Sequence, residues 1–531
     1  MKTYLSFFIL LLAATATAQY ERQGSLESQL KEVDSRFITK ELLFKDFQSQ
    51  VEGFTKREFM NEMVIDQSIP DLQKAVIKGD FSYVELTLFY LDRIYRYDRE
   101  NERSLNSVLS LNPEAIEQAA QADRSLAALK ATGDLDQVIY SLLGMPILLK
   151  DNIDVARTAT TAGAVILKDH KPEEDAPIVA NLRATGAVIL GKANLSEWAY
   201  YFCGECPSGY SAMGGQTLNP YGRKIIDTGG SSSGSGVSVA ANFAVAAVGT
   251  ETAGSILSPA SQNSVVGMKP TVGTLSGQGI IPISSYLDTA GPISKSVVDN
   301  AILFKSLLGS DNKLGSELNI AGLGNEPSLE GKRFGIYEQF MSIDLYMEAI
   351  NNLQELGAET VTIEVENPDM PNFLTILNAD MQRDLPKYFK SAGVASTSKY
   401  GIEKLVEFNN SDPKRYMLYG QRLFNEVAND KTTDVQLGKI KMETTAAARA
   451  YFTIPAAQHR LDGFLSINNY TAAAAAMAHY PAITVPMGYV DGVPFGLTFI
   501  APSGNDNQLF IWAAAYESTS KKRVSPEDYK E

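Results

Sequence analysis

Three polar side chains in this sequence could together carry out acyl transfer: those of Lys150, Ser231 and Ser255. Acyl transfer needs a nucleophile, a base within reach of it and hydrogen-bond donors for the developing oxyanion. A serine hydroxyl can be the nucleophile, and a lysine can be the base if burial lowers its pKa enough to free the neutral amine. Lys150 follows the apolar residues 145–149, which places it for that role. A lysine at a strand end can also simply reach solvent, as most lysines do.

Other catalytic chemistries lack the residues that they need. The chain has three histidines, His170, His459 and His479, and none lies in a motif that would make it the base of a serine triad. Neither of the two serines lies in a G-x-S-x-G turn. The two cysteines, Cys203 and Cys206, would need further ligands to hold zinc. We therefore expect no metal and no other cofactor.

Ser231 belongs to a run of glycines and serines, residues 229–236, whose composition is also typical of a flexible linker. The run opens directly into residues 237–242, which can continue as a helix, so its N–H groups would lie at a helix N-terminus. A short apolar strand and a second small-residue turn, residues 249–255, come next. The end of that turn, residues 252–255, lets a backbone approach a substrate oxygen closely. Because linkers do not alternate with core elements in this way, we predict a packed site.

The elements around these residues alternate between strands and helices, which is typical of an α/β fold. We expect strands at 144–151, 186–190, 245–248, 333–337, 360–365, 482–486 and 495–500. We expect helices at 81–97, 113–130, 176–183, 345–357 and 507–522, and a long helical region across 371–462. Two further segments are rich in turn formers and would line a cleft, 267–271 and 288–292. No linker divides the chain, so the prediction is one large α/β domain.

The predicted helix 81–97 has the clearest local signals. Ser82 and Glu85 match a capping box, in which each side chain accepts a hydrogen bond from the other residue's backbone N–H. An apolar stripe along the helix would face the core: Val84, Leu88, Leu91 and Tyr95. The pattern therefore predicts both where this helix begins and which face it buries.

The N-terminal segment has the order of a signal peptide: Lys2, then the apolar residues 7–12, then the small residues 16–18. The apolar run is too short to cross a bilayer, although a membrane anchor is the alternative. We expect a secreted or periplasmic protein without a membrane span, whose mature chain begins at Gln19. The predicted parts are the signal peptide at 1–18, a helical lead-in at 19–67 and the main domain at 68–531.

Charge and cysteine content limit the partners and the compartment. The 531-residue chain carries a formal net charge of −15, so we expect no nucleic-acid partner. In an oxidising compartment Cys203 and Cys206 could close a small disulfide loop, and two inert thiols are the alternative. The sequence leaves this choice open, as it does the oligomeric state.

Taken together, these segments resemble those of the amidase signature family, over roughly residues 69–522. Ser231 and Ser255 are 24 positions apart, which is the family spacing. The wording Asn-Leu-Ser-Glu-Trp at 194–198 and Gly-Thr-Glu-Thr at 249–252 is most similar to the peptide amidases of this family. The segments that carry the resemblance are 144–151, 191–198, 229–234, 249–256, 267–271, 288–292 and 480–486.

The resemblance implies a serine amidase, a hydrolase that cleaves carboxamides such as C-terminal peptide amides through an acyl-enzyme. Ser255 would be the nucleophile, Ser231 would relay the proton and Lys150 would be the base, with a cis peptide bond between Gly230 and Ser231. Backbone N–H groups would form the oxyanion hole, from Thr252, Ala253, Gly254 and Ser255. The family fold is a mixed central sheet of about a dozen strands between helical layers.

Two positions depart from the family pattern. Leu257 stands where many members carry an arginine that can engage a substrate carboxylate, and Ala253 stands where glycine is common. The alanine is a mild change, because only its N–H is needed. Leu257 favours an apolar or peptide-like amide over a small amide derived from a dicarboxylate.

Two other functions are compatible with the same family. A glutamine-hydrolysing subunit of a tRNA-modifying amidotransferase is disfavoured by the signal peptide and by the net acidity. A non-catalytic binding protein would require the loss of a catalytic residue, yet Lys150, Ser231 and Ser255 are all present. The exact amide and any esterase activity stay open.

Overall fold

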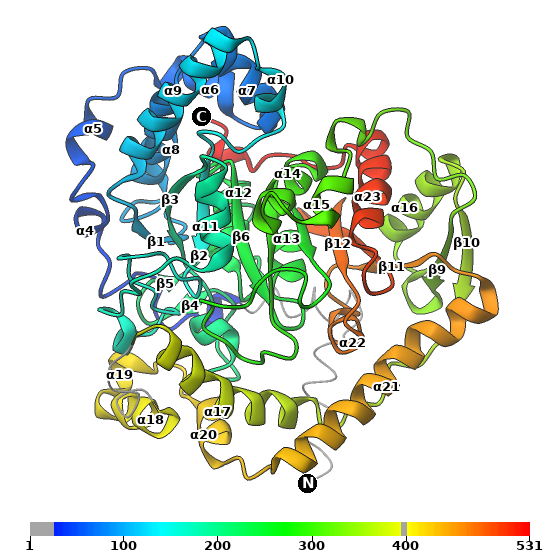
Figure 1. Ribbon diagram of the computed structural model, residues 1–531. Coiled ribbons are helices and arrows are strands. Elements are labelled where there is room, and N and C mark those ends of the chain that lie inside the picture. The colour runs from blue at the N-terminus through cyan, green and yellow to red at the C-terminus, as the bar shows by residue number, and fades with distance from the viewer. Residues whose placement is uncertain (1–25, 394–400) are drawn as a thin grey trace.

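The computed structural model describes residues 26–393 and 401–531 (Figure 1). Its centre is an eleven-stranded sheet in the order β1-β3-β2-β6-β8-β7-β12-β13-β11-β9-β10, with helices packed around it. Parallel and antiparallel pairs both occur. The predicted mixed sheet of about a dozen strands in one α/β domain is thereby confirmed. The predicted signal peptide, residues 1–18, lies outside the described residues.

The strands place two of the predicted site segments at the same edge of this sheet. β2 lies between β3 and β6 and is parallel to both, so the carboxyl ends of β2 and β6 point the same way. Lys150 ends β2, and residues 252–255 follow β6. The strands are β1 (Val108–Leu111), β2 (Pro146–Lys150), β3 (Val188–Ala193), β6 (Ala246–Glu251), β7 (Val266–Lys269), β8 (Thr289–Ser294), β9 (Arg333–Tyr337), β10 (Glu359–Ile363), β11 (Gly463–Ile467), β12 (Ala482–Val490) and β13 (Val493–Ile500), and β4 (Tyr210–Ser211) pairs with β5 (Gly215–Gln216) in a separate hairpin.

Most helices pack on the sheet or come before its strands in the sequence. They are α3 (Leu26–Gln29), α4 (Lys40–Phe44), α5 (Gln48–Glu52), α6 (Arg57–Val64), α7 (Ile69–Lys78), α8 (Tyr83–Tyr97), α9 (Ala115–Thr132), α10 (Asp136–Ile139), α11 (Pro177–Ala184), α12 (Ser233–Ala240), α13 (Leu257–Gln262), α14 (Val297–Leu308), α15 (Lys313–Glu317), α16 (Asp344–Glu355), α22 (Ala472–Ala478) and α23 (Asp506–Ser520). A further group, yellow to orange in Figure 1, forms a layer along one side: α17 (Phe373–Ser391), α18 (Ile402–Ser411), α19 (Pro413–Tyr416), α20 (Arg422–Asn429) and α21 (Asp434–His459).

The part of the chain that the structure describes includes most of the predicted lead-in, residues 19–67. It carries the short helices α3 to α6, of which α5 and α6 lie against α8 and α4 lies against β1. Phe44 and Met60 of these helices are buried in the main hydrophobic core. No helix within the described ranges is both long and apolar enough to cross a membrane.

Two segments that we expected to be turns are central strands. Residues 267–271 overlap β7, and residues 288–292 contain the start of β8. Both strands are buried, so they lack the alternation of apolar and polar residues that marks a half-exposed strand. Gly291 allows close packing rather than a turn, because a Cβ there would lie 2.1 Å from the carbonyl oxygen of Met268. The sequence pattern also missed β1 and β11, which are short.

Helix α8 confirms one local prediction and corrects another. The capping box of Ser82 and Glu85 is present. Three of the four residues of the predicted apolar stripe are only half-buried, namely Val84, Leu88 and Tyr95. The helix packs against α5, α6 and α9, so it is covered on more than one side and a single stripe does not find its innermost face. Its fully buried positions include Tyr83, Leu86, Phe89, Tyr90 and Leu91.

Candidate active site

Lys150 lies fully buried at the end of β2, with its amine surrounded by oxygen atoms. Its Nζ is 2.8 Å from Ser231 Oγ, 2.8 Å from Thr250 Oγ1 and 3.0 Å from the Thr250 carbonyl oxygen. Burial lowers the pKa of Lys150 to about 7, while the nearby carboxylates of Asp288 and Glu251 act against this shift. A large fraction of the amine is therefore neutral near neutral pH.

Asp151, which follows the lysine in sequence, is engaged elsewhere. Its carboxylate lies 3.2 Å from Lys192 Nζ on β3, and it accepts hydrogen bonds from the backbone N–H and the hydroxyl of Thr161. The carboxylates that raise the pKa of Lys150, against the effect of burial, are instead those of Asp288 and Glu251. Glu251 belongs to the segment 249–256, one of those that carry the family resemblance.

Ser231 is buried in the packed run 229–236, so the flexible-linker interpretation of this run is wrong. The Gly230–Ser231 peptide bond is cis, as the family resemblance implies. The carbonyl oxygen of Ser231 accepts a hydrogen bond from the N–H of Ser196 at 3.0 Å. Helix α12 begins at Ser233, inside the run, because the glycines and serines pack against β6 instead of extending into solvent.

Ser232 ties this run to the turn that holds the predicted nucleophile. Its N–H donates to the Ser255 carbonyl oxygen at 3.1 Å, and its hydroxyl donates to the Thr250 carbonyl oxygen at 3.0 Å. Ser255 is partly exposed, whereas Ser231 is fully buried. The Lys150 amine and the Ser231 hydroxyl are therefore buried, whereas Ser255 is partly accessible from outside.

The turn 252–255 keeps its backbone donors available. No acceptor for the N–H groups of Ala253, Gly254 and Ser255 is found within residues 26–393 and 401–531. The next N–H groups along the chain are used, since those of Ile256 and Leu257 donate to Glu251 Oε2 at 2.7 and 3.0 Å. The role of residues 252–255 as an oxyanion hole stays a prediction. Leu257, which departs from the family pattern, is buried at the start of α13.

The layer of α17 and α21 holds a loop that borders the site. Ser284 donates to Asp380 Oδ2 on α17 at 2.6 Å, and Lys441 on α21 lies 2.6 Å from Asp380 Oδ1. The same loop leads to Asp288, which accepts a hydrogen bond from the Thr252 hydroxyl. Burial raises the pKa of Asp288 to about 6.

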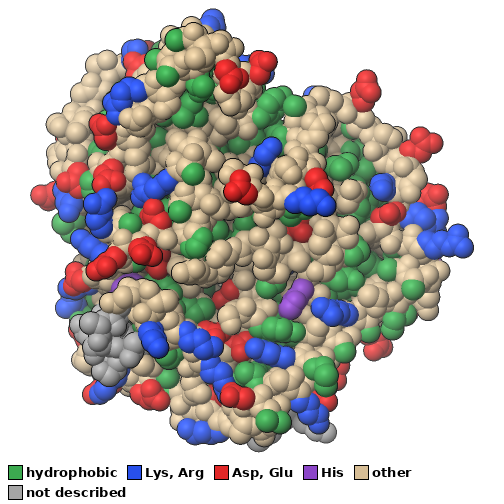
Figure 2. Space-filling model, viewed as in Figure 1, with side chains coloured by type: hydrophobic (Ala, Val, Ile, Leu, Met, Phe, Trp, Pro, Cys, Tyr) green, Lys and Arg blue, Asp and Glu red, His purple; other side chains and the backbone are tan. Residues whose placement is uncertain are grey.

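On the face of the molecule that Figure 2 shows, acidic and basic side chains are interspersed, and neither sign forms a separate patch.

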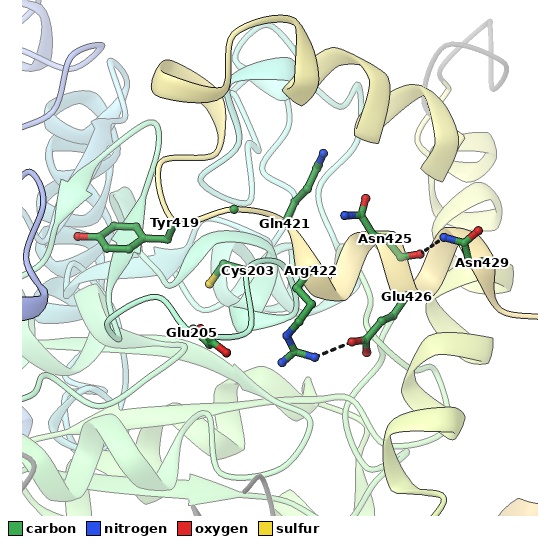
Figure 3. Close-up of a pocket in the computed structure, with 9 residues that line it drawn as sticks. Cys203, Glu205, Tyr419, Gln421, Arg422, Asn425, Glu426 and Asn429 are labelled. Carbon is green, nitrogen blue, oxygen red and sulfur yellow. Dashed lines mark hydrogen bonds and ion pairs between the residues drawn. The ribbon is translucent and has the colours of Figure 1, made fainter. Parts of the chain in front are cut away.

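The two cysteines lie apart from this chemistry. In the structure a disulfide joins Cys203 to Cys206. Cys203 lines a hollow of about 490 Å³ beside α20 (Figure 3). Polar groups in the wall of that hollow bond one another, as in the 2.5 Å pair of Arg422 and Glu426. Among the described residues, no group of His, Cys, Asp and Glu is placed to hold a metal ion.

Comparisons with known proteins agree on one relationship. The family model described as Amidase matches residues 85–510. A protein of Arabidopsis thaliana named as an amidase is 33% identical, over 87% of this chain and 91% of its own length. An amidase family protein from Bacillus anthracis matches with a TM-score of 0.85 and 34% identity, over 93% of this chain and 100% of that one. The native peptide amidase from Stenotrophomonas maltophilia matches with a TM-score of 0.77 and 35% identity, over 87% and 99%.

Proposed function

This chain belongs to the amidase signature family and is a hydrolase that acts on amides, and from that premise we propose that it works through an acyl-enzyme on Ser255. Lys150 would be the base, and Ser231 would carry the proton between Lys150 and Ser255. The observation that carries this proposal is the 2.8 Å contact between Lys150 Nζ and Ser231 Oγ, made by a lysine whose pKa is about 7.

The hydrogen bonds around the lysine fit its neutral form. A neutral amine has two N–H donors and one lone pair. The Thr250 carbonyl oxygen, 3.0 Å from the amine, can only accept, and the Thr250 hydroxyl lies 2.8 Å from the amine. If both N–H groups of the neutral amine are directed at Thr250, its lone pair would face the Ser231 hydroxyl 2.8 Å away, which would then donate to Lys150. The lysine would therefore be set to draw a proton through Ser231.

The steps follow from this arrangement. Ser231 gives its proton to Lys150 and takes the proton of Ser255, whose oxygen attacks the carbonyl carbon of the amide. The negative charge on the carbonyl oxygen is met by the backbone N–H groups of residues 252–255. As the carbon–nitrogen bond breaks, the proton returns through Ser231 to the leaving amine. Water then attacks the acyl-enzyme by the same relay, which frees the acid and restores Ser255.

We infer that the substrate is a carboxamide outside the peptide backbone, such as a C-terminal peptide amide. Support comes from the likeness to the peptide amidase of Stenotrophomonas maltophilia. Further support comes from Leu257, an apolar residue where an arginine would favour a substrate carboxylate. A screen of C-terminally amidated peptides against fatty and aryl amides tests this preference.

We also infer that the protein is exported. The signal-peptide pattern of residues 1–18 and the Cys203–Cys206 disulfide both support an oxidising compartment. Recovery of the protein from the medium or the periplasm, with Gln19 as its first residue, is the expected result. An uncleaved N-terminus in a cytoplasmic fraction would contradict it.

The nucleophile is tested by covalent labelling. A fluorophosphonate probe should modify Ser255 in the wild type, and Ser255→Ala should lose both labelling and amide hydrolysis, because only the attacking oxygen is removed. Ser258→Ala, a serine three residues on in α13, is the matched control and should keep both. If Ser255→Ala retains more than a few per cent of the wild-type rate, Ser255 is not the nucleophile.

A further inference from the structure

The turn 252–255 is supported by bonded side chains on one flank. The Thr252 hydroxyl donates to Asp288 Oδ1 at 2.5 Å. Asp288 Oδ2 accepts the backbone N–H groups of Ile283 and Ser284 at 2.8 and 3.0 Å. Both oxygens of the Asp288 carboxylate thus accept hydrogen bonds from within the protein.

The other flank of the turn is formed by Asn469, which follows β11. A Cβ at Gly254 would lie 2.9 Å from Asn469 Nδ2 and 3.5 Å from the Cβ of Ala472. Gly254 also has a φ of +101°, which favours glycine. The Asn469 amide therefore lies directly over the residue that precedes Ser255.

The backbone around Asn469 is fixed. The N–H of Ala472 donates to the Asn469 carbonyl oxygen at 3.0 Å. The preceding Asn468 exchanges hydrogen bonds with Gly496, through its N–H and its Oδ1, both at 2.8 Å. Asn469 therefore lies in the short turn between β11 and α22, and hydrogen bonds hold its backbone next to the sheet.

The side-chain amide of Asn469 has no hydrogen-bond partner within the described parts of the chain. Asn469 is half-buried, so part of the residue is accessible to solvent. Asn152, also near the site, is engaged, because it donates to Thr250 Oγ1 at 3.0 Å. The neighbouring Asn468 accepts from Gly496 through its Oδ1, while its buried Nδ2 has no partner among the described residues. An amide beside the nucleophile with free donors is a specificity element when the substrate supplies the acceptor.

We propose that Asn469 binds the acyl part of the substrate and selects acyl groups that contain a second amide. Its Nδ2 donates a hydrogen bond to the carbonyl oxygen of that amide, next to the bond that is cleaved, as in an N-acylated aminoacyl amide. Nδ2 is the Asn469 atom nearest Gly254, and an amide carbonyl is a matching acceptor. This inference rests on the proposed function, since it takes Ser255 as the nucleophile.

Two substrates that differ only in the second amide test the proposal: N-acetyl-L-phenylalaninamide and 3-phenylpropanamide. In Asn469→Ala, kcat/KM for the first should fall about fivefold to tenfold, the value of one hydrogen bond, and should change less than about twofold for the second. Asn469→Asp keeps the size of the side chain but loses its N–H donors. Its kcat/KM on the first substrate should fall at least as far as that of Asn469→Ala. Asn372→Ala, an exposed asparagine without a cap hydrogen bond, is the control and should leave both values unchanged.

Labelling separates a failure of this inference from a failure of the mechanism. Asn469→Ala should react with a fluorophosphonate at Ser255 at the wild-type rate, because the nucleophile and its relay are untouched. An equal loss on both substrates, or no loss on either, would overturn the role of Asn469 while the labelled serine still stands. A wild type that is not labelled at Ser255 would overturn both.

Discussion

Two buried lysines on neighbouring strands differ in what surrounds their amines. Lys150 on β2 pairs with Ala193 of β3, and Lys192 pairs with Leu149, so the two lysines are one step apart in the sheet. Both are completely buried. Lys192 lies 3.2 Å from the carboxylate of Asp151, whereas the contacts of Lys150 are hydroxyl and carbonyl oxygens of Ser231 and Thr250.

The difference shows that two equally buried lysines can have different electrostatic surroundings. Burial penalises any charged amine, and a carboxylate in contact compensates for that penalty. Asp151 is adjacent to Lys150 in sequence, but its carboxylate contacts Lys192. Within the described residues no carboxylate contacts Lys150, so burial lowers its pKa to about 7, which is what the proposed role as a base requires. Lys192 forms a structural ion pair.

The largest expected effect is on the rate when Lys150 is removed. Lys150→Ala and Ser231→Ala should each lower kcat/KM by about 10²- to 10⁴-fold, the range for loss of a positioned base. The double variant should be little worse than the more damaged single one, because the two groups share one proton path. Steady-state kinetics of the three variants measure this. If the fold-loss in the double variant equals the product of the two single losses, the lysine and the serine act independently.

The next effect is on stability and should separate the two lysines. Lys192→Met leaves the buried Asp151 carboxylate without its partner and should cost about 3–5 kcal/mol in the free energy of unfolding. Lys150→Met removes a buried amine that has no carboxylate in contact and should cost far less. Urea denaturation compares them, with Lys192→Met combined with Asp151→Asn as the control that restores most of the loss. Equal costs for the two single variants would contradict the comparison.

A smaller effect is expected in the pH profile. The neutral fraction of Lys150 grows as pH rises through its pKa of about 7, so kcat/KM should rise across that range and fall on acidification. Asp288 favours the charged amine, so Asp288→Asn should move the acid limb to lower pH, even if the lost Thr252 contact lowers the plateau. Activity that increases below about pH 5 would mean that a neutral lysine is not the base.

The smallest effect should come from chelators. A bound metal would be another way to activate a nucleophile, and neither the sequence nor the described residues offer a ligand cluster for one. Dialysis against EDTA should therefore change the amidase rate by less than about twofold. If EDTA abolished activity and zinc restored it, a metal ion and not a neutral lysine would activate the nucleophile.

Much of the fold could be predicted because its signals are local. Strand β9 has the predicted bounds, and the capping box fixes the start of α8. The lysine after an apolar strand and the two serines 24 positions apart were also readable from the order of residues alone. Their catalytic roles stay predictions, although the structure brings Lys150 and Ser231 into contact.

What the sequence by itself determined is therefore the elements that have strong local signals, and the types of residue that end them. The tertiary structure decided which strands are central, as for β7 and β8, and which carboxylate contacts which lysine. It also placed Asn469 over Gly254, more than two hundred positions away in the chain. The physical reason is that helix periods and caps depend on a few neighbouring residues, whereas burial on both faces and the partner of a charge depend on strand order.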